Sequence, residues 1–263
     1  FVYSEIVEVQ RLVNTELNVI VRKGNKYLAV SSNGEIDVEK IKDMFNVVKE
    51  AFLTPVFSDN DRELKSISYS NLKDIIEKGD ISSIVEDIYS SEFPLSGILQ
   101  VSENSISLVT SKGFNGLTVK YSADGYFRAF NKNYSGQWAF YSDSLSPLKD
   151  SIKQANVLAS IDGETKVYDG KYDVVLSPLV VGNLMSDFSY FASAFSVYTG
   201  SSFLYNVKQG DKIASEKLSI YDVPNKLGTR EFDDEATFTY DKPLIENGIF
   251  QTLLYNNELA KLM

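Results

Sequence analysis

Apolar and polar positions alternate with a period of two in the N-terminal part of the chain. Residues 5–12 and 17–22 follow this pattern closely, and a Lys-Gly-Asn turn leads into a third such run at 26–31. Alternation places the apolar side chains on one face of a strand, so these runs predict a three-stranded meander. Asp37 is a favourable N-cap, and apolar positions at helical spacing behind it predict a helix from 38 to about 51.

The middle of the chain predicts an antiparallel sheet flanked by helices. Asn71 and Asp80 precede two short helical segments, at 72–78 and 84–89, and a longer helix is predicted from Pro147 to about residue 158. The period of two returns at residues 95–101, 105–110, 117–121, 126–131 and 137–141, with turns at Glu103-Asn104, Lys112-Gly113 and Asp124-Gly125. These runs predict about five antiparallel strands.

The last third of the chain mixes helical and strand patterns. Residues 172–176 predict a short buried strand, and Ser177-Pro178 predicts the start of a helix because proline is favoured at the first helical position. Apolar residues recur along that helix at helical spacing: Val180, Leu184, Phe188, Phe191 and Phe195. Strands are predicted at 218–221, 236–240 and 249–255, with a hairpin turn at Asn247-Gly248.

These elements predict an α+β fold rather than a doubly wound one, because strands and helices do not alternate along the chain. We predict an N-terminal meander-plus-helix module at 1–55, a middle module of antiparallel sheet and helices at 56–165, and the start of a mixed α/β module at 166–263. The chain starts at Phe1 and stops at Met263 inside a predicted helix. We therefore expect a fragment whose third module is incomplete.

Composition narrows the possible chemistry. The 263 residues include 26 Lys+Arg and 36 Asp+Glu, a net charge of −10, and no histidine or cysteine. Without these two residue types the chain cannot supply a Ser-His-Asp relay, a thiol nucleophile or a His- or Cys-ligated zinc. Its negative charge disfavours nucleic acid as a partner. We expect a soluble, cytoplasmic protein, since no apolar run is long enough to span a membrane.

The densest acidic cluster is Asp233-Asp234-Glu235, which closely follows Arg230. Adjacent carboxylates can hold a hard cation or raise the pKa of one member for acid–base chemistry. Neighbouring residues of an extended chain point to alternating faces, however, so these three do not converge on one ion. We favour a turn whose acids accept backbone N–H groups and pair with Arg230.

Three other groups have a structural and a functional interpretation. The aromatic residues between Tyr126 and Tyr141 are better explained by sheet packing than by base stacking, given the negative charge. Ser201-Ser202 lacks a histidine base anywhere in the chain. Asp222-Val223-Pro224-Asn225 with Gly228 indicates a turn-rich loop.

An ordered series of motifs resembles the TldD/PmbA family, also called modulator of DNA gyrase or TldD/TldE proteases. The series comprises Gly200-Ser201-Ser202-Phe203-Leu204, Ile220-Tyr221-Asp222-Val223-Pro224, Gly228-Thr229-Arg230-Glu231-Phe232-Asp233-Asp234-Glu235 and Ile245-Glu246-Asn247-Gly248-Ile249. Ala236 stands where the family usually has glycine, which implies a slightly different turn. By this resemblance, Ser202, Phe203, Asp222, Arg230, Asp233, Asp234 and Glu235 are family-motif or peptide-chamber candidates.

The family has two branches. TldD-like members carry HExxxH on the helix that opens the third module and hold a zinc there, whereas PmbA/TldE-like members lack the motif. The corresponding helix here begins at Pro178 and offers Asp187 but no histidine. The resemblance therefore implies a PmbA/TldE-like chain with no catalytic residues and no cofactor of its own. Zinc is expected only in a TldD-like partner, with which the chain would act on small or unfolded peptides, and strand addition is one way of holding them.

Two alternatives stay open. In the first alternative, the chain is a stand-alone peptide- or protein-binding homodimer, which includes the gyrase-related role behind the older family name. In the second, it is an independent hydrolase that uses carboxylates such as Asp233 and Glu235. Association with an HExxxH-bearing partner separates the first alternative from the leading hypothesis. Changing both acids to their amides tests the second.

Overall fold

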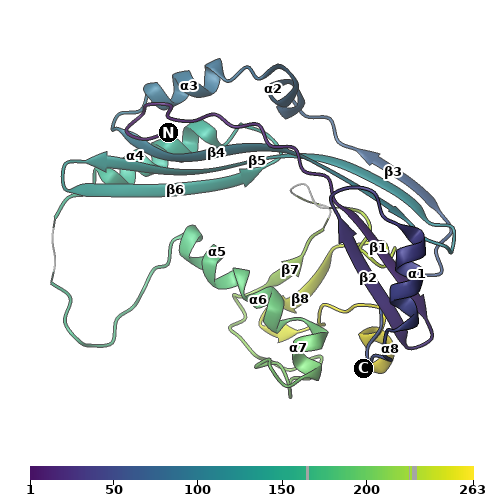
Figure 1. The fold of residues 1–263 in the computed structure, drawn as a ribbon. Helices are drawn as coiled ribbons and strands as arrows, with labels where there is room; N and C mark the ends of the chain where they lie inside the picture. The colour runs from purple at the N-terminus through teal and green to yellow at the C-terminus, as the bar shows by residue number, and fades with distance from the viewer. Residues whose placement is uncertain (164–165, 225, 227–229) are drawn as a thin grey trace.

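Two long strands organise the molecule in the computed structural model, which describes residues 1–163, 166–224, 226 and 230–263. β4 (Leu95–Val109) and β5 (Asn115–Asn131) pair antiparallel along the whole length of β4. β6 (Tyr134–Ser142) pairs with one end of β5, and β3 (Glu63–Ile67) pairs parallel with its other end. Figure 1 shows this sheet above the third module, with the hairpin of β1 and β2 to one side. Strands and helices in largely separate stretches confirm the predicted α+β class.

The middle sheet differs from the five short strands that the sequence predicts. The expected turns at Glu103-Asn104 and Asp124-Gly125 do not exist, because both pairs lie inside continuous ladders. Gly125 instead makes room for packing, since a Cβ there would lie 2.7 Å from the Phe127 ring. The turn at Lys112-Gly113 is confirmed, with a Gly113 φ of +105°. The parallel strand β3 was not predicted.

The N-terminal hairpin follows its pattern only in part. β1 (Leu17–Lys23) and β2 (Lys26–Ser32) pair antiparallel as predicted. α1 (Val38–Asn46) has the predicted N-cap, because the Asp37 carboxylate accepts hydrogen bonds from backbone N–H groups of the first helical turn. The helix ends at Asn46, before the predicted residue 51. The predicted strand at 5–12 is wrong: Glu5 makes an isolated bridge to Val2, and the residues beyond it form no strand.

Helices cover one face of the middle sheet. α2 (Leu72–Lys78), α3 (Ser82–Tyr89) and α4 (Leu148–Ala159) are close to their predicted bounds. The main core lies under α3 and α4 and includes Ile88, Leu95, Phe127 and Leu148. Gly136 allows α4 to approach the sheet, because a Cβ there would lie 2.3 Å from the Ala155 carbonyl oxygen.

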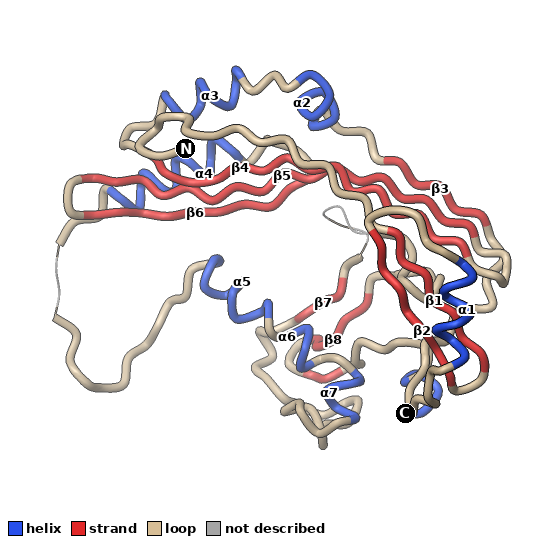
Figure 2. Tube along the Cα trace, viewed as in Figure 1, coloured by secondary structure: helices blue, strands red, loops and turns tan. Residues whose placement is uncertain are grey.

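The third module consists of short elements. Its helices are α5 (Pro178–Ser186), α6 (Phe188–Phe191), α7 (Ala194–Tyr198) and α8 (Leu259–Leu262), and its strands are β7 (Ile220–Asp222), β8 (Lys242–Glu246) and β9 (Ile249–Phe250). The hairpin turn between β8 and β9 is confirmed by left-handed φ values of +49° at Asn247 and +77° at Gly248. Figure 2 shows the helices and strands of this module joined by long loops.

Several predictions for the third module are wrong. Residues 172–176 are an exposed extended segment rather than a buried strand, with Val175 99% exposed. The predicted single helix is interrupted at Asp187 and again at 192–193. Residues 236–240 form a turn and loop instead of a strand, and the strand predicted to reach 255 ends at Phe250. In the described ranges, no helix has the length and apolar character needed to cross a bilayer.

Candidate functional site

The acidic motif forms a tight turn, here called the acidic turn, over Phe232–Thr237. The Asp233 carboxylate accepts from the backbone N–H groups of Glu235 (2.9 Å) and Thr237 (2.8 Å), and the Asp233 N–H donates to the Thr237 carbonyl (2.9 Å). Ala236 has a φ of +60°, so it adopts the left-handed conformation that glycine usually takes. The expectation that this carboxylate binds backbone N–H groups is confirmed.

Arg230 and Asp234 lie on the outer side of the acidic turn. Their side chains form an ion pair of 2.7 Å and are 31% and 78% exposed. Solvent screens such a pair, so its contribution to stability is about 0–1 kcal/mol. The predicted pairing with Arg230 is therefore present, but only for the middle acid of the three.

Glu235 joins three distant segments. One carboxylate oxygen accepts from the Val56 N–H (3.1 Å), and the other accepts from the Asn257 N–H (2.7 Å). The Asn257 amide completes the junction by donating to the Val56 carbonyl (2.8 Å) and the Thr237 hydroxyl (2.9 Å). Both oxygens of Glu235 thus serve backbone donors, which is the arrangement of a structural carboxylate.

Glu231 is the polar residue that sequence reasoning missed. Its half-buried carboxylate accepts from the Ser66 hydroxyl (2.6 Å), the Thr118 hydroxyl (3.0 Å) and the Lys120 ammonium (2.6 Å). Burial raises the pKa of Glu231, but the hydrogen bonds from Lys120 and Ser66 together lower it by more than burial raises it. The pKa of Glu231 therefore lies below its usual value. These partners are more than 100 residues away, and no local signal in the sequence indicates them.

Aromatic packing anchors the acidic turn against the sheet. Phe232 and Phe114 are fully buried, with ring centroids 5.2 Å apart in an edge-to-face arrangement. Phe238 adds a second edge-to-face contact to Phe114 at 6.2 Å. Gly116 lies beneath them, where a Cβ would lie 2.7 Å from the Phe114 ring and 2.8 Å from the Phe232 ring. The turn is therefore held by apolar packing on one side and by Glu231 and Glu235 on others.

The remaining motif residues belong to other parts of the third module. The Ser202 hydroxyl is buried, donates to the Phe191 carbonyl (2.6 Å) and accepts from the Leu204 N–H (3.0 Å), so it holds the loop after α7. Phe203 is 62% exposed, and its ring contacts Phe191 at 5.5 Å. Asp222 pairs with Lys242 at 2.5 Å. Within the described residues, none of the hydrogen bonds or ion pairs found joins Ser202 or Asp222 to the acidic turn.

The turn-rich loop predicted after Asp222 lies only in part within the described residues. Asn225 and Gly228, which belong to that prediction, lie outside the described residues. Pro224 is in a turn and Asp222 ends β7, where it pairs with Lys242 of β8. The structure therefore places the start of the loop at the sheet edge of the third module.

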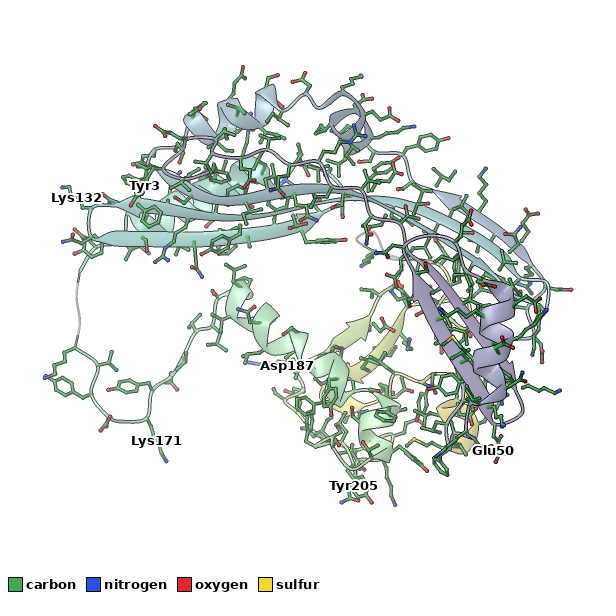
Figure 3. All side chains as sticks on the ribbon, viewed as in Figure 1. Tyr3, Glu50, Lys132, Lys171, Asp187 and Tyr205 are labelled. Atoms are coloured by element: carbon green, nitrogen blue, oxygen red, sulfur yellow. The ribbon has the colours of Figure 1, made fainter. Side chains whose placement is uncertain are left out.

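The donor groups of this chain do not suit a zinc ion. The sequence contains no histidine or cysteine, and the part of the chain that the structure describes brings no three Asp or Glu side chains together in a metal-binding arrangement. Asp187, which follows α5, is exposed (Figure 3). Protein zinc sites use three or four N, S or O ligands, so a single aspartate does not replace an HExxxH set. No chemical step through zinc is assigned to this chain.

Comparisons with known proteins place the chain in a class of metallopeptidase-like proteins. Residues 169–263 match the model of the PmbA/TldA metallopeptidase C-terminal domain. A metalloprotease of Methanocaldococcus jannaschii is 23% identical over 270 residues, covering 99% of this chain and 57% of the relative. A metalloprotease of Methanothermobacter thermautotrophicus is 33% identical over 94 residues, covering 35% of this chain and 20% of the relative.

Solved structures show the same fold. A putative modulator of DNA gyrase from Thermotoga maritima has a TM-score of 0.78 and 20% identity, covering 100% of this chain and 65% of that chain. TldE from Thermococcus kodakarensis has a TM-score of 0.75 and 18% identity, covering 100% of this chain and 64% of that chain. The match of residues 169–263 and the metalloprotease relatives support the TldD/PmbA family for this chain, which spans 57% of the length of the Methanocaldococcus relative.

Proposed function

We propose that this chain is the non-catalytic, PmbA/TldE-like subunit of a zinc-dependent peptidase pair that acts on small or unfolded peptides. The observation that carries the proposal is the complete absence of histidine and cysteine in a member of a metallopeptidase family. α5 starts at the predicted Ser177-Pro178 pair, yet it carries no histidine where the catalytic branch of the family has HExxxH. The zinc and the catalytic base then belong to a TldD-like partner.

The state of the acidic residues supports a structural role for the third module. Asp233 and Glu235 accept hydrogen bonds from backbone N–H groups of their own or neighbouring segments. A carboxylate that is held by backbone donors in this way is poorly placed to activate water. We propose that these acids shape one wall of a peptide chamber that the partner completes. A cytoplasmic location is part of the proposal and can be checked by cell fractionation.

Metal content and activity together test the proposal. The purified chain is assayed for zinc and for cleavage of an unfolded peptide, alone and after mixing with an HExxxH-bearing TldD-like protein. We expect no zinc and no cleavage for the chain alone, stable copurification with the partner, and cleavage by the mixture. A partner in which both motif histidines are alanine is the control. Zinc bound stoichiometrically by the lone chain, or failure to associate, would contradict the proposal.

A second candidate function is a stand-alone binding homodimer with a gyrase-related role. It is favoured by the name of two similar solved structures, from Thermotoga maritima and Bacteroides thetaiotaomicron, each described as a putative modulator of DNA gyrase. A pull-down of purified gyrase by this chain, with and without the TldD-like partner, distinguishes the two functions. Gyrase capture by the chain alone supports the second function, and capture only through the partner argues against it.

A further inference from the structure

A cleft lies between the end of α3 and one face of α4. Its volume is about 410 Å³, and its walls are charged and polar side chains of both helices together with Ser90, Ser91 and Glu92, which follow α3. Ile88 of α3 and Ile152 of α4 belong to the same core cluster, so packing holds the two walls together. Small-molecule sites in proteins have volumes of about 300–1,000 Å³, and this cleft falls in that range.

Asn156 is the buried polar residue of this cleft. It is 7% exposed, and its side-chain oxygen Oδ1 accepts a hydrogen bond from the Phe93 backbone N–H at 3.2 Å. That bond identifies the oxygen end of the amide, so the Nδ2 group of Asn156 donates to the Ser91 hydroxyl oxygen at 2.9 Å. An amide group has two hydrogens to donate, and Ser91 is the one acceptor found for them among the described residues. One N–H of a firmly held side chain therefore remains for an oxygen of a ligand.

Two pairs of opposite charges line the cleft. The first pair is closed, because the Lys149 ammonium lies 3.3 Å from the Asp87 carboxylate and bridges α4 to α3. The second pair is Lys153, one helical turn after Lys149, and Glu92. Both of these residues are exposed, and within the described ranges neither side chain has an ion-pair or hydrogen-bond partner. Two unpaired charges of opposite sign in one cleft suit a ligand that carries both a carboxylate and an ammonium.

The two walls differ in polarity. α3 ends at this cleft, where its Ile88 carbonyl accepts the Ser91 N–H at 3.3 Å. The C-terminal end of a helix carries a partial negative charge, so an ammonium is favoured on this side, next to Glu92. Lys153 and Asn156 are three residues apart on α4 and therefore lie on the same face of that helix. A carboxylate is favoured on the α4 side, where a cation and a spare N–H are both within the cleft lining.

We propose that this cleft binds a small zwitterion with an apolar side chain, of the class of free amino acids and dipeptides. The carboxylate of the ligand bonds to the Lys153 ammonium and the Asn156 amide, and its ammonium pairs with Glu92. Its side chain contacts Ile152 and Val157, the apolar residues of the cleft lining. The inference goes beyond the proposed function and does not depend on it, because the cleft belongs to α3 and α4 and uses no residue of the acidic turn.

Analogues that lack one of the two charges test the proposal on the intact chain. Leucine and leucyl-leucine are the probes, while N-acetyl-leucine lacks the ammonium and leucinamide lacks the carboxylate. In an NMR titration, the side-chain amide of Asn156 and the backbone amides of Ser91 and Lys153 are expected to shift when a zwitterion is added. Each one-charge analogue should bind about fivefold more weakly than leucine, because one charge-assisted hydrogen bond is lost. Binding of either zwitterion with this pattern supports the proposal, and their relative affinities tell which of the two fits better.

Variants of the two unpaired charges make the outcome specific. Lys153→Gln should weaken leucine binding about fivefold and remove its advantage over leucinamide, whereas Glu92→Gln should remove its advantage over N-acetyl-leucine. Lys40→Gln, at an exposed lysine of α1 outside the cleft, is the matched control and should leave binding unchanged. Equal binding of leucine and its one-charge analogues, or no shift of these amides at millimolar zwitterion, would overturn the proposal. Neither result affects the zinc and copurification tests of the proposed function, since those tests do not use this cleft.

Discussion

The acidic turn and the segment Lys166–Ser186, here called the apolar arm, differ in how well their side chains are packed against the rest of the molecule. The acidic turn carries three carboxylates in sequence, yet Phe232 and Ala236 within it are fully buried. The apolar arm is rich in valine, leucine and tyrosine, yet α5 at its end has no buried residue. Figure 1 shows the arm leaving the middle sheet after α4 and looping away before α5 returns to the third module.

The difference comes from available partners rather than from side-chain polarity. Every acid of the turn finds a donor: backbone N–H groups for Asp233 and Glu235, and Arg230 for Asp234. Most apolar side chains of the arm are exposed, and Lys171 points away from the rest of the molecule (Figure 3). Contiguous exposed apolar surface is typical of regions that association covers. Charged residues are held in the fold where hydrogen-bond donors reach them, and the apolar residues of the arm stay exposed.

The largest expected effect is loss of the aromatic anchor beneath the acidic turn. Phe232→Ala removes a fully buried ring that packs edge-to-face on Phe114, so we expect the free energy of unfolding to fall by about 3–5 kcal/mol. Urea denaturation followed by circular dichroism measures it. Phe203→Ala is the matched control, because Phe203 is 62% exposed, and it should lower stability by less than about 1 kcal/mol. Similar losses for both variants would contradict the contrast.

A glycine of β5 beneath the acidic turn and a glycine of the apolar arm give a second pair. Gly116→Ala places a methyl group 2.7–2.8 Å from the Phe114 and Phe232 rings, and we expect a loss of about 1–3 kcal/mol from overpacking. Gly182 lies in α5, and a Cβ added there would have no other atom within 4 Å, so Gly182→Ala should instead favour the helix by about 0.5–1 kcal/mol. Opposite signs in thermal denaturation are the expected result, and a destabilising Gly182→Ala would show that α5 is packed in solution.

Local signals in the sequence predicted two helix starts and a hairpin turn correctly, but they failed where packing between distant residues decides the structure. The Asp37 cap, the Ser177-Pro178 helix start and the Asn247-Gly248 turn each depend on residues a few positions apart, and each is present. Asp124-Gly125 has the composition of a turn, but the glycine is required by the Phe127 and Phe140 rings that pack over it. No single-sequence pattern distinguishes a glycine needed for a turn from one needed for packing.

The same limit applies to the candidate site. The Arg230–Asp234 pair spans four residues and was predicted from the sequence. Glu231 and Glu235 have partners brought to them only by the folded chain, such as Lys120 from β5 and Val56 from the connecting segment before β3. The strand predicted at 172–176 failed for a related reason, because β propensity needs a neighbouring strand and none lies beside Val175.

The ion pair between Glu231 and Lys120 gives the next effect in size. Glu231→Gln keeps the shape but removes the charge-assisted hydrogen bonds, and we expect a loss of about 1–2 kcal/mol at neutral pH. The pKa of Glu231 is lowered in the folded state, so its contribution is present above the unfolded value of about 4.3 and is lost as the pH falls through the folded value.

A pH series separates this contribution from a purely steric one. The difference in stability between the native chain and Glu231→Gln should be constant from about pH 7 to pH 5 and shrink below about pH 4. Glu16→Gln, a change at an exposed residue that precedes β1, serves as the control for general acid effects. A difference that stays constant down to about pH 3 would mean that the charge of Glu231 does not contribute.

The smallest expected effect on folding comes from the apolar arm. Val175→Asp puts a charge on a side chain that is 99% exposed, so the free energy of unfolding should change by less than about 0.5 kcal/mol. Val197→Asp is the matched control: Val197 is 6% exposed in the core of the third module, and an unpaired buried charge there should be severely destabilising. A loss above about 2 kcal/mol for Val175→Asp would show that the arm is covered in solution. Sedimentation velocity on Val175→Asp and the native chain then tells whether self-association covers the arm, because a charge at an interface weakens the assembly while leaving the folded protomer intact.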